Sequence, residues 1–182
     1  MKARAQPYPL PGCPIRIPSP LWDGALATVR DYATRGAERG REGSEALVYF
    51  GGVVAGDEMI VTSLYRLSHL PQGDRVVVAR EESRWLLREL RARDEKLVGQ
   101  LHSHRGSAGH SAGDDAWATS FHEGFLSIVA PFFARGVTAP AECAVLEYRA
   151  GEFVELDVSE VEQSIRVYEP IVERDGAPAV EE

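Results

Sequence analysis

Apolar positions recur with two different periods along the chain, and these periods predict helices and strands. Helical spacing predicts helices over 20–35, 81–93 and about 113–122, and a last helix that opens at Ser159. Short β-rich runs predict strands over 45–54, 59–66, 74–79, 97–104, 125–133, 141–149 and 152–158. This mixture of hairpins and crossovers predicts an α/β (α+β) fold, with helices packed around one sheet.

Local signals sharpen the predicted helices. Ser19-Pro20 is typical of an N-cap followed by proline in the first turn. The second helix is predicted to bury Trp85, Leu86 and Leu90. Ser159 and Glu162 fit a capping box at the start of the last helix. Its helical repeat comprises Val158, Val161, Ile165 and Tyr168.

Proline and charge divide the chain into three parts. Six of the eleven prolines lie in the first 20 residues, so residues 1–18 are predicted to form an extended arm. Residues 19–169 are predicted to form one domain. Residues 170–182 are predicted to be an acidic, frayed tail.

Composition excludes several classes of protein. The chain has 182 residues, 44% apolar and 26% charged, which indicates one ordinary globular domain. No apolar run approaches a membrane span, and the first residues show no secretory signal. The net charge of −8 disfavours binding to nucleic acid, because phosphate contacts need clustered Lys and Arg. Cys13 and Cys143 form no metal-binding pair, so a reduced, cytoplasmic setting is expected.

The candidate chemistry lies in the segment 99–118, where three of the five histidines cluster. His102 and His104 are two residues apart at a predicted strand end, so both imidazoles lie on one side of the strand. Asp114 or Asp115 could supply a third ligand, and two histidines with one carboxylate leave the open position typical of catalytic zinc. The structural alternative is that Ser111 and Asp114 form a capping box before a helix.

The combination of His-x-His with Ser-x-x-Asp resembles the motif of the JAB/MPN (JAMM) metalloprotease family. A strand containing Glu45 and the pair Gly51-Gly52 lies upstream, and an apolar strand follows the motif, as in that family. The similarity extends over about 15–168. It implies an MPN/JAB-like (cytidine deaminase-like) mixed sheet flanked by helices.

The resemblance also implies roles for five residues. His102, His104 and Asp114 would bind one catalytic Zn²⁺, and Ser111 would donate a hydrogen bond to the developing oxyanion. Glu45 would be the general base that also protonates the leaving amine.

Several alternatives remain open within this motif. Glu42 is a rival for the general base, and His110 is an alternative ligand that more plausibly serves loop packing or substrate contact. The loop between His104 and Ser111 is one residue shorter than is usual in the family. If Asp115 were the ligand, its distance from His104 would be the usual one, but Ala112 would then stand at the position of the serine. Ser111 with Asp114 is therefore preferred.

The function implied is zinc-dependent cleavage of a ubiquitin-like protein from its conjugates, or processing of its C-terminal tail. Stand-alone bacterial members are the most similar, which implies activating-like and conjugating-like enzymes as partners and a setting in antiphage defence. The alternative is a catalytically inactive MPN-type scaffold. Deaminase and His-Glu-x-x-His signatures are absent. The sequence predicts no oligomeric state.

Overall fold

The computed structural model describes residues 11–38, 43–67, 69–72, 75–109 and 122–171. The helices are α1 (Ser19–Glu38), α2 (Arg80–Ala92) and α4 (Val158–Ser164), with short 3₁₀ turns at Pro131–Ala134 and Pro140–Glu142. The strands are β1 (Ile15–Pro18), β2 (Leu47–Ala55), β3 (Glu58–Tyr65), β4 (His69–Gln72), β5 (Arg75–Val78), β6 (Lys96–Ser103), β7 (Leu126–Ala130), β8 (Ala144–Arg149), β9 (Glu152–Glu155) and β10 (Ile165–Tyr168).

A mixed sheet of eight strands organises the described part of the chain, in the order β10-β1-β3-β2-β6-β7-β8-β9. Parallel pairs join β1 to β10, β1 to β3 and β6 to β7, while the remaining pairs are antiparallel. Strands β4 and β5 form a separate hairpin. The predicted α+β arrangement around one sheet is confirmed at this level.

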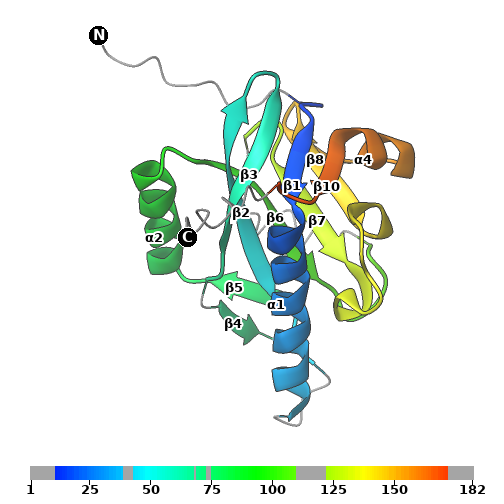
Figure 1. The fold of residues 1–182 in the computed structure, drawn as a ribbon. Coiled ribbons are helices and arrows are strands. Elements are labelled where there is room, and N and C mark those ends of the chain that lie inside the picture. Colours follow the sequence, from blue (N-terminus) through cyan, green and yellow to red (C-terminus); the bar gives the residue numbers. More distant parts are fainter. Residues whose placement is uncertain (1–10, 39–42, 68, 73–74, 110–121, 172–182) are drawn as a thin grey trace, which may run out of the picture.

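Helix α1 packs against one face of the sheet (Figure 1). Its side chains Trp22, Leu26 and Val29 are buried in the larger apolar core, together with alternate residues of the central strands. Trp22 Nε1 donates to the carbonyl of Thr138 at 2.8 Å, so the indole is buried with its polar group satisfied. The helix predicted over 20–35 is therefore present and is slightly longer than expected.

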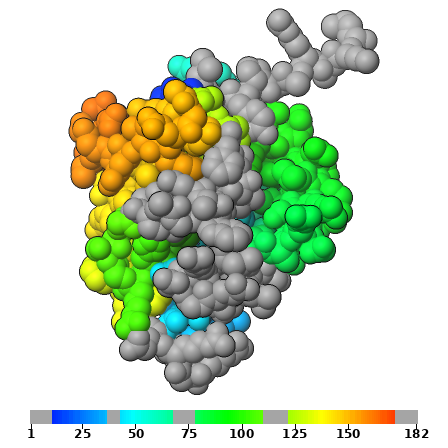
Figure 2. Space-filling view, turned by 180° about the vertical axis from the view of Figure 1, so that it is seen from behind, coloured from blue at the N-terminus to red at the C-terminus, as the bar shows by residue number. Residues whose placement is uncertain are grey.

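Helix α2 forms a second, smaller core on the other face. Leu86 and Leu90 are buried there against Leu47, Tyr49 and neighbouring residues of the sheet. Trp85 was expected to be buried but is 37% exposed, because it lies at the edge of this cluster and contacts the ring of Tyr65 from the side. Figure 2 shows α2 along one flank of the molecule and α4 along the other.

The C-terminal elements differ from the sequence prediction. Asp157, not Ser159, caps α4: its carboxylate accepts from Glu160 N, and the Glu160 carboxylate accepts from Asp157 N, each at 2.9 Å. The helical repeat predicted through Tyr168 is wrong. Residues Ile165–Tyr168 form β10 instead, because they pair in parallel with β1.

Strand β1 lies within the segment predicted to be an extended arm. Residues Ile15–Pro18 are extended, and they pair on both sides, with β3 and with β10. Ile15 and Ile17 are buried in the larger core. The predicted boundary at residue 18 stays a prediction, but these four residues belong to the sheet.

A carboxylate ties the end of α2 to strand β3. Thr62 Oγ1 and Ser63 Oγ donate to Glu95 Oε1, and the Tyr65 hydroxyl donates to Glu95 Oε2, each at 2.6 Å. Burial alone would raise the pKa of Glu95, but the three hydroxyl donors outweigh it and hold that pKa below its ordinary value. Burial, followed by the bond to Glu95, raises the pKa of Tyr65 to about 12, so the hydroxyl remains a donor.

The Glu95 cluster predicts an acid-sensitive contribution to stability. Since the folded-state pKa lies below the unfolded value of 4.5, the contribution is present above pH 4.5 and is lost as pH falls through the folded-state pKa. Urea unfolding of wild type and Glu95→Gln should differ most near neutral pH and converge in acid. A matched Glu152→Gln variant, at an exposed strand position, should follow wild type throughout. A constant gap between wild type and Glu95→Gln across this range would contradict the prediction.

Among the described residues, no helix combines the length and the apolar character needed to cross a membrane.

Candidate active site

The candidate site lies where the start of β2 pairs with the end of β6. The two strands are antiparallel, with Leu47 opposite His102. Ser103 N donates to the Ala46 carbonyl at 3.1 Å, and Ala46 N donates to Ser103 Oγ at 3.3 Å, so the pairing continues beyond the strand ends. Residues sixty positions apart in the chain are thereby brought together.

The two histidines lie on one face of β6, as their spacing predicts. Their ring centroids are 5.0 Å apart, with an angle of 57° between the ring planes. His102 is buried, including both ring nitrogens, whereas His104 is half-buried. The pair therefore presents one deep and one more accessible imidazole.

Glu45 lies on the same face as the histidines. It precedes Leu47 by two residues, and Leu47 is the partner of His102, so alternation directs Glu45 toward the His104 end of β6. The Glu45 carboxylate accepts a hydrogen bond from Arg105 N at 3.3 Å, which places it beside the residue that follows His104. Glu45 and the end of β6 therefore lie side by side.

A turn with left-handed backbone follows β7 and binds the segment after His104. Phe132, Phe133 and Ala134 have φ values of 50°, 57° and 60°, which is unusual for residues other than glycine. Phe132 N donates to the Gly106 carbonyl and Phe133 N to the His104 carbonyl, each at 2.8 Å. The prediction of a strand over 125–133 is wrong at its end, because β7 stops at Ala130 and the chain turns at Pro131.

Side-chain contacts hold this turn in place. The Phe133 ring lies so close to Gly43 that a Cβ there would meet Phe133 Cζ at 2.7 Å, and Gly43 itself has φ of 103°. Arg30 Nε of α1 donates to the Ala134 carbonyl at 2.9 Å. The left-handed turn thus contacts both the segment that leads to Glu45 and the segment that follows His104. Sequence reasoning missed this role, since backbone handedness has no local signal in Pro-Phe-Phe-Ala.

The remaining predicted site residues lie outside the described residues. Ser111 and Asp114 belong to this group, as do the alternatives Asp115, His110 and Glu42. The helix predicted over about 113–122 also lies outside the described residues, except for its last position. Within the described ranges, no group of three or more His, Cys, Asp or Glu side chains could hold a metal ion. The third ligand and the oxyanion donor therefore stay predictions.

The two described imidazoles, His102 and His104, have a geometry that fits a zinc ion. Two imidazoles bound to one tetrahedral zinc at about 2.1 Å would have ring centroids roughly 5 Å apart, as His102 and His104 do. The pair also places the two donors on a single face of the strand. Imidazole nitrogen is a preferred zinc ligand, so the donor chemistry agrees with the geometry.

The two cysteines and His122 lie outside the candidate site. Cys13 is half-buried, with Sγ 3.2 Å from the Asp57 carbonyl, and burial raises its pKa. Burial raises the pKa of Cys143 to about 12, so it stays a thiol. His122 Nε2 lies 2.8 Å from the Leu97 carbonyl, in agreement with a structural role.

Fold and site together define a class: an α+β protein whose central antiparallel strand pair carries two histidines and a glutamate at one end. The solution structure of protein DSY2949 from Desulfitobacterium hafniense has a similar fold, with a TM-score of 0.62 and 18% identity. That similarity covers 86% of this chain and 94% of the other. No family model matches the sequence.

A sequence comparison finds a relative that is named as a probable metalloprotease. The chain is 36% identical over 100 residues to the probable metalloprotease y4jG of Sinorhizobium fredii (strain NBRC 101917 / NGR234). The match covers 53% of this chain and 62% of that protein, so it spans less than two thirds of the relative's length.

Proposed function

We propose that this protein is a zinc-dependent peptidase of the JAB/MPN (JAMM) type that cleaves amide or isopeptide bonds. The observation that carries the proposal is the placement of His102, His104 and Glu45 on one face at one end of the β2–β6 pair. The named relative, a probable metalloprotease, supports the general class of activity.

In this proposal, some residues bind the metal and others transfer protons or stabilise charge. His102 and His104 would hold the ion, together with Asp114 on the sequence prediction. Zinc, when bound, would polarise the scissile carbonyl as a Lewis acid. The Glu45 carboxylate would take a proton from the attacking water and deliver it to the leaving amine. Ser111 is proposed to donate to the oxyanion.

The proposed substrate is a ubiquitin-like protein, either in a conjugate or as a precursor with a C-terminal tail. Its extended C-terminus could add to the site as a strand, a common mode of peptide recognition. A reporter amide on a peptide ending in Gly-Gly is a direct probe of this substrate class. The proposed setting is a bacterial conjugation system with activating-like and conjugating-like enzymes, cytoplasmic and of the antiphage type.

Metal content tests the proposal first. Purified protein should bind about one zinc per chain, and His104→Ala should bind well below one because a ligand is lost. Mass spectrometry of the metal after dialysis measures both. His122→Gln is the matched control, since His122 lies outside the site and should leave zinc content unchanged. Wild-type protein that takes up no zinc would favour the inactive scaffold instead.

A further inference from the structure

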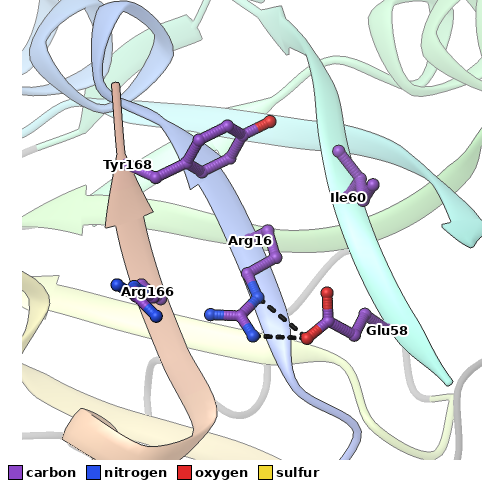
Figure 3. Close-up of a pocket in the computed structure, with 5 residues that line it drawn as sticks. All are labelled: Arg16, Glu58, Ile60, Arg166 and Tyr168. Carbon is purple, nitrogen blue, oxygen red and sulfur yellow. Dashed lines mark hydrogen bonds and ion pairs between the residues drawn. The ribbon is translucent and has the colours of Figure 1, made fainter. Parts of the chain in front are cut away.

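A pocket lies on the sheet at its β10–β1–β3 edge, away from the candidate active site. It has a volume of about 400 Å³ and is lined by Arg16, Glu58, Ile60, Arg166 and Tyr168 (Figure 3). Arg16 is the register partner of Arg166 on one side and of Ile60 on the other. The lining therefore forms a row of side chains across three adjacent strands.

One end of the pocket is positively charged. Arg16 donates from Nε to Glu58 Oε1 at 2.9 Å, and a second nitrogen of the same guanidinium also contacts that oxygen. The Arg166 side chain lies directly beside Arg16 in the strand register, and its charge helps to lower the pKa of Glu58, after the larger effect of the hydrogen bond from Arg16. Two guanidinium groups thus face one carboxylate, in a chain whose net charge is −8. Adjacent like charges repel, so an anion between them would be stabilised.

The other end of the pocket is apolar. The Tyr168 ring extends from β10 across β1 toward Ile60 on β3, and together these two side chains face the space above Arg16 (Figure 3). The volume lies within the range of small-molecule pockets, about 300–1,000 Å³. The pocket therefore combines a cationic end with an apolar end that includes an aromatic face.

The pocket is distant from the histidines. Ile60 pairs with Val53 of β2, and Val53 follows Glu45 by eight residues, which span roughly 26 Å of extended chain at about 3.3 Å per residue. A ligand of this pocket would therefore be distinct from the group that reacts at the candidate active site.

We infer that this pocket binds a singly charged carboxylate carried on an aromatic or apolar body. The carboxylate lies between Arg166 and the side of the Arg16 guanidinium that does not face Glu58, and the body packs on Tyr168 and Ile60. Arginine matches carboxylate geometry with two parallel hydrogen bonds. Glu58 disfavours a doubly charged anion such as phosphate, because its own charge lines the same end. Both a free aromatic acid and a peptide C-terminus ending in an aromatic residue have this chemistry.

Binding of phenylacetate and of N-acetyl-Gly-Phe to the full chain tests the inference, with amide resonances followed by NMR. At least one should bind with Kd of about 1 mM or tighter and should shift the amides of Tyr168 and Ile60. Tighter binding by phenylacetate assigns a free acid as the ligand, whereas tighter binding by N-acetyl-Gly-Phe assigns a peptide C-terminus. Phenylacetamide and inorganic phosphate should bind at least about tenfold more weakly.

Two arginine variants give the matched comparison. Arg166→Gln changes an exposed side chain and should weaken carboxylate binding about tenfold or more. Arg35→Gln makes the same change of charge on α1, where the side chain is 62% exposed, and should leave binding unchanged. Equal binding of acid and amide, an unaffected Arg166→Gln, or equal losses in both variants would each overturn the inference. So would the failure of both carboxylates to bind.

Discussion

Glu45→Gln is expected to retain about one zinc per chain and to lower the cleavage rate about a thousandfold. Glutamine keeps the size of the side chain and can still accept the hydrogen bond from Arg105 N, but it cannot take up a proton. Loss of a positioned general base typically removes a factor of about 10²–10⁴. The rate is measured with the Gly-Gly reporter amide and the metal content in parallel.

Two comparisons make the Glu45 result specific. Glu152→Gln, at an exposed position on β9, should have wild-type activity and zinc content. Glu42→Gln tests the rival base from the sequence. Full activity in Glu45→Gln combined with its loss in Glu42→Gln would transfer the role to Glu42. Loss of zinc from Glu45→Gln would mean that the carboxylate supports the metal rather than the proton transfer.

Gly52→Ala is expected to destabilise the fold by about 3 kcal/mol, a large fraction of the stability of an ordinary domain. A Cβ at Gly52 would overlap the Ile60 carbonyl oxygen and lie 2.8 Å from Val98 Cγ2. The carbonyl belongs to the neighbouring strand and cannot move without disturbing the sheet. Urea unfolding followed by circular dichroism measures the change in free energy.

Gly109→Ala is the matched control for the glycine substitution. Among the described residues, a Cβ at Gly109 would meet nothing within 4 Å, so the free energy of unfolding should change by no more than about 0.5 kcal/mol. Equal stability of Gly52→Ala and wild type would contradict the close approach of β2 and β3 at this position.

The glycine pair illustrates what the sequence could and could not predict. Gly51-Gly52 was recognised as part of a family-like motif, but its physical reason lies between strands. The pairing of β2 shifts register with β6 between Phe50 and Gly51, and with β3 between Gly51 and Gly52. At Gly51 a Cβ would meet Tyr65 Cε2 at 2.7 Å. A local sequence pattern cannot predict how closely two segments that are distant in the chain approach each other.

Errors in the predicted elements have the same origin. The repeat through Tyr168 suits a helix locally, yet Ile165–Tyr168 form a strand because β1 offers a parallel partner. The run after Ala130 suits a strand, yet Pro131 and hydrogen bonds to the His104 segment turn the chain. Trp85 has the spacing of a buried residue but lies at the rim of the smaller core. For Ile165–Tyr168 and for the turn after Ala130, hydrogen bonds to a distant segment outweigh local strand or helix propensity, whereas the exposure of Trp85 depends on where α2 lies on the sheet.

The sequence by itself determined the alternation of apolar elements and the side of the strand on which His102 and His104 lie. These features follow from the period of each element, which is a local property. Only the tertiary structure decided that Glu45 meets the end of β6, that a left-handed turn binds the His104 segment, and that Arg16 and Arg166 lie side by side. Those results depend on which strands pair and in what register, and pairing is set by packing across the whole sheet.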